Sequence, residues 1–347
     1  MKFEGVEKEV FEKTGLEAKP INDHLLYFES EDRGEVIIEV DSASMLEEDL
    51  TQMEKHAGFL DKDKHAQLVL ESFRDTLKML GGFIPQDKLQ RLFPGLELAD
   101  LDSYDFSLAK IKVFVLSNED YDFFRATQYP GRDIEGEGGF TRPTVSSYPG
   151  SFVKTEMQVD VSEKKVIVVR ELWDTPRELI EKEGGKLPRS LTSEEQALIA
   201  RNIKATLIHE FLHDLDVSTD LPKPFKEGVT EWYAQQVANG IQGGDSLFEN
   251  RGVVVGYKNE TEGVSIIMNT LIEGGITQET IDRAFLSADS ESRKSIADFL
   301  ANRYGDEQAD KIMNWRFESS RKSLRYIIEL ESKKDSDIGR FLRTYKS

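Results

Sequence analysis

Two histidines and a glutamate stand together in the stretch His209-Glu210-Phe211-Leu212-His213. Residues four apart lie on one face of a helix about a turn from each other, so a helix here would let His209 and His213 bind one metal ion. Glu210 would then lie beside the metal, where it can take a proton from a metal-bound water. The pattern predicts a zinc site with hydrolytic chemistry, in which Glu210 is the general base.

The residues before this motif predict the helix that positions it. Two overlapping capping boxes occupy residues 190–196, a pattern typical of a helix N-terminus. We expect the helix to run from there through His213 to about Leu215. Asp214 and Asp216 are interpreted as its end, although Asp216 and Asp220 could in principle also bind the metal.

A third ligand is expected from a second helix, because two histidines leave a catalytic zinc short of one protein ligand. The prolines at 222 and 224 end one element, and the pattern of Phe225–Val237 predicts a helix after them. Glu227 and Glu231 are four residues apart on this helix and face the same way. One of them can bind zinc while the other accepts a hydrogen bond from a ligand histidine.

The two motifs together, His-Glu-x-x-His and a following Glu-Gly-x-Thr-Glu, resemble those of the gluzincin metallopeptidases, in which a glutamate on a second helix completes the zinc site. The resemblance covers about Arg201–Val237. It implies a bound Zn2+ with His209, His213 and Glu227 as ligands, Glu210 as the general base, and Glu231 behind a ligand histidine. The strands before the motif also resemble the upper subdomain of that clan, whose edge strand holds an extended substrate.

The chain departs from the gluzincin pattern in two ways. The interval from His213 to Glu227 is shorter than in the best-known gluzincins, so Glu231 remains an alternative ligand. No histidine follows His213, so a histidine cannot be the downstream group that stabilises the oxyanion. A tyrosine hydroxyl could donate that hydrogen bond instead, and Tyr257 is the first candidate and Tyr304 the second.

A second zinc-peptidase pattern does not fit. A metzincin would place a third histidine six residues after His213, and Thr219 stands there. The glycine of that pattern is also missing, because its position is occupied by Asp216.

The composition restricts the chemistry further. The chain has 347 residues, a formal net charge of -20 and no cysteine. Without cysteine, disulfides, thiolate metal sites and a cysteine nucleophile are excluded, and a metal must be bound by nitrogen and oxygen. The acidic excess argues against nucleic acids and anionic membrane surfaces as partners and fits cationic peptides or no particular partner better. A peptide or protein substrate is what the gluzincin resemblance implies.

Targeting signals are not visible in the sequence. The apolar runs are too short to cross a bilayer, so no integral membrane segment is expected. The first residues lack the apolar core of a signal peptide, which favours a cytoplasmic location. The oligomeric state cannot be predicted.

The order of the predicted elements together with the gluzincin resemblance implies an α+β fold: a zincin-like catalytic domain with a small mixed sheet, an active-site helix and a mainly helical C-terminal subdomain, preceded by a small α/β unit. We expect residues 1–95 to form that unit and residues 96–347 the catalytic domain, with its strand-rich part reaching about residue 217. The predicted elements before the motif are strands at Glu35–Val40, Ala109–Leu116, Phe152–Val161 and Lys164–Arg170, and helices at Ser42–Ala57 and Lys64–Leu80.

These observations favour a zinc-dependent metallopeptidase that hydrolyses peptide bonds with a zinc-activated water and a glutamate base. The alternative is a catalytically inactive zincin-like protein that keeps the zinc site for a binding or regulatory role.

Overall fold

The chain divides into two compact units, each built from two segments of the sequence. The first combines Met1–Asp61 with Lys110–Glu171, and the second combines Lys62–Ala109 with Leu172–Ser347. The computed structural model describes residues 19–20, 25–30, 34–39, 62–116, 139–142, 165–170, 193–215, 217, 221–240, 258–317 and 319–345.

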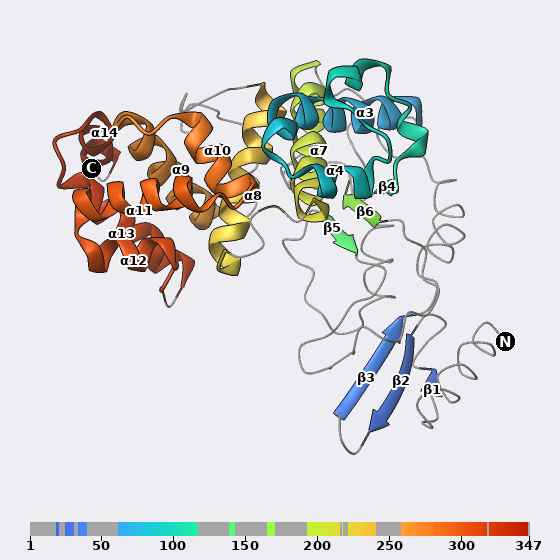
Figure 1. Ribbon diagram of the computed structural model, residues 1–347, viewed down its shortest axis with the longest axis horizontal. Coiled ribbons are helices and arrows are strands. Elements are labelled where there is room, and N and C mark those ends of the chain that lie inside the picture. The colour runs from blue at the N-terminus through green and yellow to red at the C-terminus, as the bar shows by residue number, and fades with distance from the viewer. Residues whose placement is uncertain are drawn as a thin grey trace, which may run out of the picture. The chain divides into compact units, whose positions relative to one another are not determined.

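The first unit contains short strands in two three-stranded sheets (Figure 1). One sheet has the antiparallel order β1-β2-β3; in the other, β6 pairs with β4 in parallel and with β5 antiparallel. β3, β4 and β6 fall where the sequence predicts strands, whereas Ser42–Ala57 and Phe152–Val161 lie outside the described residues. The strands are β1 (Lys19–Pro20), β2 (Leu25–Ser30), β3 (Gly34–Glu39), β4 (Ile111–Leu116), β5 (Gly139–Arg142) and β6 (Lys165–Arg170).

The second unit carries the His-Glu-x-x-His motif and is built from helices throughout its described residues. Short 3-10 turns at Gly81–Phe83, Leu98–Ser103 and Phe106–Leu108 link its first elements. The α-helices are α3 (Lys62–Leu80), α4 (Gln86–Leu92), α7 (Ser193–Asp214), α8 (Lys223–Asn239), α9 (Lys258–Glu273), α10 (Gln278–Leu286), α11 (Ser290–Tyr304), α12 (Asp306–Met313), α13 (Ser320–Ser332) and α14 (Asp337–Tyr345).

The predicted α+β fold class is therefore wrong. The described part of the chain is mainly helical, and within the described part of the second unit no strand accompanies the motif helix. The expected mixed sheet around the motif was inferred from the gluzincin resemblance, and that resemblance covers only about 37 residues, Arg201–Val237. So short a match does not determine the fold of the remaining chain. Helical packing partners, not strands, surround the described part of α7 within this unit.

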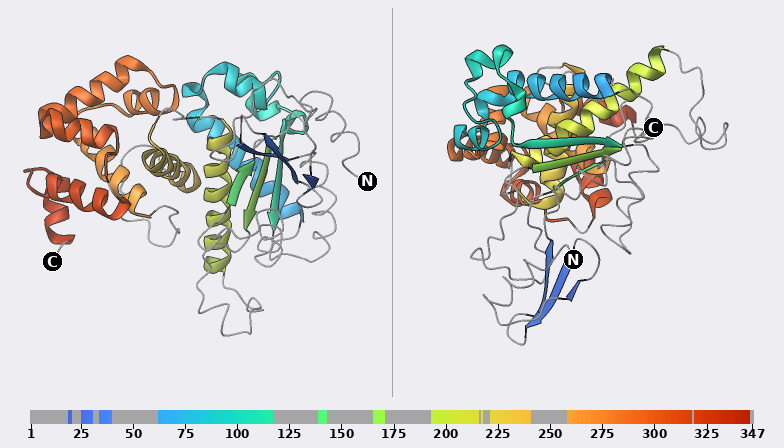
Figure 2. Two further views of the ribbon diagram at one scale, coloured as in Figure 1. Left: turned by 90° about the horizontal axis from the view of Figure 1, so that it is seen from below. Right: turned by 90° about the vertical axis from the view of Figure 1, so that its right-hand side faces the viewer.

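Helix α3 belongs with the motif helix, although the sequence grouped it with the N-terminal unit. α3 packs against α7, and Figure 2 shows the two helices side by side. The ring centroids of Phe73 and Phe211 are 4.7 Å apart, and those of Phe93 and Phe211 are 5.6 Å apart. Phe211 is completely buried. The expected boundary near residue 95 thus falls inside the second unit, since these aromatic contacts join its two segments.

The motif helix α7 spans almost the range that its capping pattern predicts. Its inner face, including Leu207, Phe211 and Leu212, is fully buried. A guanidinium nitrogen of Arg91, from α4, donates to the backbone oxygen of Asp214 at 3.3 Å. A cation that binds the last carbonyls also complements the negative end of the helix dipole, so the end of α7 near His213 is held in place.

Helix α8 confirms the predicted second helix and extends it by two residues at each end. Pro222 lies at its N-terminal cap, and Gly240 ends it in the left-handed conformation, with φ 64°. Its residues from Phe225 to Ala238 are buried apart from Lys226. A helix buried on nearly all sides is a central element of its unit rather than a surface helix.

Gly228 has a packing role beside Glu227. A Cβ atom at this position would lie 2.9 Å from the backbone oxygen of Glu260 and 2.9 Å from Cγ2 of Val264, both on α9. Only glycine therefore lets α9 approach α8 this closely. In the Glu-Gly pair of the second motif, a polar residue of the site is therefore followed directly by a residue at the contact between α8 and α9.

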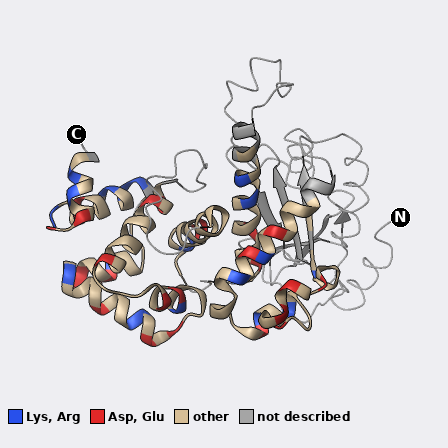
Figure 3. Ribbon diagram, turned by 90° about the horizontal axis from the view of Figure 1, so that it is seen from above, with Lys and Arg blue, Asp and Glu red and all other residues tan. Residues whose placement is uncertain are grey.

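The C-terminal helices carry basic and acidic residues interspersed along their length (Figure 3). Several form ion pairs one turn apart, such as Arg283 with Glu279 and Lys333 with Glu329. Helical periodicity in this region predicts Ile281, Phe285, Ile296, Phe299 and Leu300 as core residues, and of these Phe299 is only half-buried. Ile281, Phe285, Ile296 and Leu300 have no exposed surface.

Candidate metal centre

Three side-chain atoms from α7 and α8 converge on one point. Nε2 of His213 is 3.0 Å from Nε2 of His209 and 3.0 Å from Oε2 of Glu227. Nε2 of His209 is 3.4 Å from the same Glu227 oxygen. His209 and Glu227 are buried and His213 is half-buried, so all three groups are largely removed from water. They form a group that could bind a metal ion.

The size of this triangle suits a small divalent metal. Tetrahedral ligands 2.0–2.1 Å from a zinc ion lie about 3.3 Å from one another, close to the three separations here. A triangle with these edges has a circumradius of about 1.8 Å, so a point at zinc–ligand distance from all three atoms exists. Two imidazoles and one carboxylate leave a further coordination position open, as catalytic zinc sites require.

Glu231 lies behind His209 rather than beside the three ligand atoms. Its Oε2 is 2.8 Å from Nδ1 of His209, and its Oε1 accepts a hydrogen bond of 2.6 Å from Nε2 of Gln235. A proton on Nδ1 leaves the lone pair on Nε2 for a metal. The geometry therefore distinguishes the two glutamates: Glu227 belongs to the group that could bind a metal ion, whereas Glu231 contacts the other nitrogen of the His209 ring.

The charges of the site are strongly coupled. Burial alone would lower the pKa of His209, but its hydrogen bonds to Glu227 and Glu231 outweigh burial and raise this pKa to about 10. Burial would raise the pKa of Glu227, yet hydrogen bonds from both histidines hold it well below its usual range. Burial lowers the pKa of His213, against the opposing effect of its hydrogen bond with Glu227. The metal-free site thus favours a protonated His209 beside an ionised Glu227.

The metal-free protein should keep His209 protonated well above the usual range of histidine. Since the pKa of His209 is higher in the folded chain than the unfolded value near 6.5, its stabilising effect is complete below about pH 6.5 and is lost as the pH rises toward 10. Nuclear magnetic resonance of the imidazole ring, with His209→Gln for assignment, should give a midpoint far above 6.5. A midpoint near 6.5 would contradict the coupling to Glu227 and Glu231.

Glu210 follows His209 on α7. It is buried, with 8% of its surface exposed, and its charge acts on His209 to raise the pKa of that ring. The two residues after it, Phe211 and Leu212, are fully buried in the core. The motif thus divides its positions between packing and polar chemistry, and the carboxyl group of Glu210 lies within electrostatic reach of the ligand cluster.

Among the described residues, neither of the two tyrosines expected to stabilise the oxyanion is found at this cluster. Tyr257 lies outside them, as do Asp216 and Asp220. Tyr304 donates its hydroxyl to Glu331, and burial and that carboxylate raise the pKa of Tyr304. Its hydroxyl is therefore engaged in a different network.

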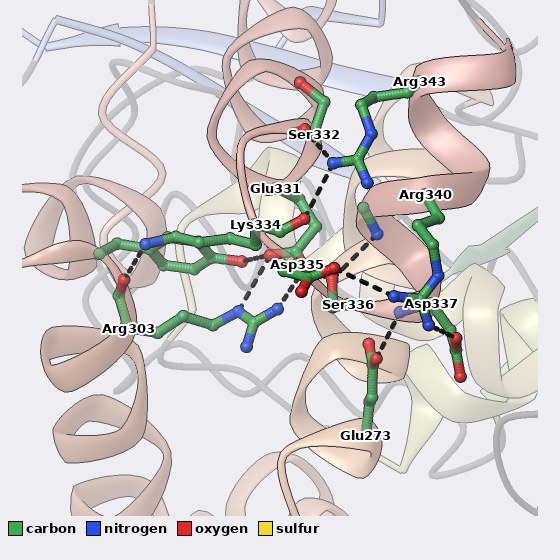
Figure 4. Close-up of polar contacts among 12 residues, drawn as sticks. Glu273, Arg303, Glu331, Ser332, Lys334, Asp335, Ser336, Asp337, Arg340 and Arg343 are labelled. Carbon is green, nitrogen blue, oxygen red and sulfur yellow. Dashed lines mark hydrogen bonds and ion pairs between the residues drawn. The ribbon is translucent and has the colours of Figure 1, made fainter.

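That network connects α11, α13 and the start of α14 (Figure 4). Glu331 is fully buried and accepts hydrogen bonds from Nε of Arg303 at 3.0 Å and from Oγ of Ser336 at 2.8 Å. A buried carboxylate that is paired and hydrogen-bonded in this way is a structural link between helices.

Two contributors to the site were not identified from the sequence. Gln235 donates to Glu231, and Gly228 sets the distance between α8 and α9. The signal for Gln235 was its position four residues after Glu231, which continues the stripe of polar side chains on one face of the helix.

Comparison with known proteins gives no assignment, since no family model, curated protein or solved structure matches this chain. Among the described residues, no helix combines the length and the apolar composition needed to span a membrane.

Proposed function

We propose that this protein is a zinc-dependent metallopeptidase of gluzincin type. The observation that carries the proposal is the triangle of His209 Nε2, His213 Nε2 and Glu227 Oε2, with edges of 3.0–3.4 Å. Its arrangement matches the roles that the gluzincin resemblance implies for these residues. The short interval between the motifs does not prevent convergence, because α7 and α8 pack directly on each other.

Zinc is the metal that this donor set favours. Two neutral imidazoles and one carboxylate form one of the ligand sets of catalytic zinc sites, and the chain has no thiolate that would build a closed structural site. The hydrogen bond from His209 Nδ1 to a buried carboxylate is the arrangement that orients histidine ligands and raises their basicity. A bound zinc ion supplies Lewis-acid polarisation of a carbonyl and lowers the pKa of water.

The chain's own residues would complete the reaction. Glu210 takes a proton from the attacking water and passes it to the amine that leaves when the C–N bond breaks, so one water is consumed for each peptide bond. Glu231 keeps His209 in the tautomer that offers Nε2 to the metal. The buried packing of α7 and α8 holds these groups in position before substrate arrives.

The proposal is tested by the metal dependence of peptide hydrolysis. The full-length chain should cleave members of an unbiased peptide library, lose this activity on treatment with a chelator, and regain it when zinc is added back. Hydrolysis that continues unchanged in the metal-free protein, or no hydrolysis by fully zinc-loaded protein, would overturn it. The absence of hydrolysis by fully zinc-loaded protein would favour the alternative hypothesis, a catalytically inactive zincin-like protein with a binding or regulatory role.

A further inference from the structure

A polar stripe on α8 extends beyond the groups that a metal would touch. Glu227, Glu231 and Gln235 follow one another at intervals of four residues and are 8%, 5% and 1% exposed. Residues at this spacing share one face of a helix. The first belongs to the convergent group, the second contacts the ring of His209, and the third donates a hydrogen bond to the second.

The buried carboxylate of Glu231 needs donors for both of its oxygens. Oε2 is taken by Nδ1 of His209 at 2.8 Å. Oε1 accepts from Nε2 of Gln235 at 2.6 Å. A buried carboxylate oxygen left without a donor is costly, and its side chain can turn to find another partner. Without Gln235, the orientation of Glu231 toward His209 would no longer be fixed from both sides.

Both the backbone and the side chain of Gln235 are confined by their surroundings. The side-chain nitrogen of Asn239 donates to the backbone oxygen of Gln235 at 2.8 Å, one turn before the helix ends at Gly240. The side chain of Gln235 is almost completely enclosed, so its amide is positioned by its surroundings rather than by chance.

We propose that Gln235 is a positioning residue for the metal centre. Through Glu231 it fixes the ring of His209 with Nε2 facing the metal, and so it raises the affinity of the site for zinc. This inference rests on the proposed zinc site, but it concerns affinity and orientation rather than peptide cleavage.

The neighbouring Gln236 offers a matched control. It lies on the same helix, is 3% exposed, and its side-chain oxygen has no hydrogen-bond partner. Methionine has nearly the length of glutamine without its hydrogen bonds. Gln235→Met and Gln236→Met therefore remove equivalent amides from equally buried positions, of which only the first contacts Glu231.

The experiment measures the zinc dissociation constant of the full-length chain by competition with a chromophoric chelator. Gln235→Met should weaken zinc binding by about 10-fold or more, the range seen when groups behind metal ligands are lost, and Gln236→Met should match the parent. Thermal unfolding of the metal-free variants shows that both fold. In the double variant Glu231→Gln/Gln235→Met, affinity should be no lower than in Glu231→Gln alone, because Gln235 acts through Glu231.

The other possible results distinguish the positioning role of Gln235 from the peptidase proposal. A Gln235→Met protein that binds zinc as tightly as the parent overturns the positioning role and leaves the peptidase proposal intact. Equal losses in the two methionine variants, or additive losses in the double variant, would assign the effect to general packing and also overturn it. A parent that binds zinc without cleaving peptides would overturn the peptidase proposal alone.

Discussion

Replacing Glu210 with glutamine should lower kcat/KM for peptide hydrolysis by about 10²- to 10⁴-fold while leaving zinc bound. Glutamine has almost the same size as glutamate but cannot accept the proton of the attacking water at neutral pH. Neither Glu210 nor its replacement is among the three convergent ligand atoms, so zinc affinity should change little. The loss corresponds to about 3–5 kcal/mol of transition-state stabilisation.

The control is Asp75→Asn. Asp75, on α3, forms an ion pair with Lys204 of α7, so this substitution also removes one carboxylate next to α7, but away from the ligand cluster. It should hydrolyse peptides at the parent rate. If Glu210→Gln cleaved peptides as fast as Asp75→Asn with equal zinc content, Glu210 would not be the base.

Glu227→Ala should weaken zinc binding by more than about 100-fold, beyond the 10- to 100-fold loss typical of a group that only supports a ligand. The carboxylate of Glu227 is one of three convergent donors, and its removal leaves only two imidazoles. Glu231→Gln, by contrast, should fall within the 10- to 100-fold range, because it alters a hydrogen bond to His209 and removes no ligand.

The comparison of the two glutamate variants decides between their roles. Zinc affinity should be measured under the same competition conditions at one pH, since protons compete with zinc for the histidines. A larger loss for Glu231→Gln than for Glu227→Ala would mean that Glu231 is the ligand, the alternative that the sequence by itself left open.

The convergence of His209, His213 and Glu227 could be predicted from the sequence largely because the spacing within each helix is local. Spacings of four residues on α7 and α8 place each pair of polar groups on one face, whatever the remainder of the chain does. The capping pattern before residue 197 predicted the start of α7, and Pro222 and Gly240 flank α8. What the spacing could not provide was the assignment of Glu227 and Glu231, because that depends on how α8 is rotated and shifted against α7.

The fold class could not be predicted, for a related reason. The contacts of Phe211 with Phe73 and Phe93 join segments more than a hundred residues apart, and no local pattern encodes them. Runs such as Ile111–Leu116 and Lys165–Arg170 do form paired strands, but they belong to a different compact unit from the motif helix. Side-chain periodicity indicates the type of an element and says little about its tertiary neighbours.

The most direct measurement of the central claim is the metal content of the purified full-length protein, determined by elemental analysis together with Glu227→Ala. We predict one zinc per parent chain, in equilibrium with limiting free zinc, and a much lower content in the variant. Two histidines and a carboxylate can also bind ferrous iron, so the analysis must cover both metals. A parent that takes up no metal, or iron in preference to zinc, would contradict the zinc centre at His209, His213 and Glu227.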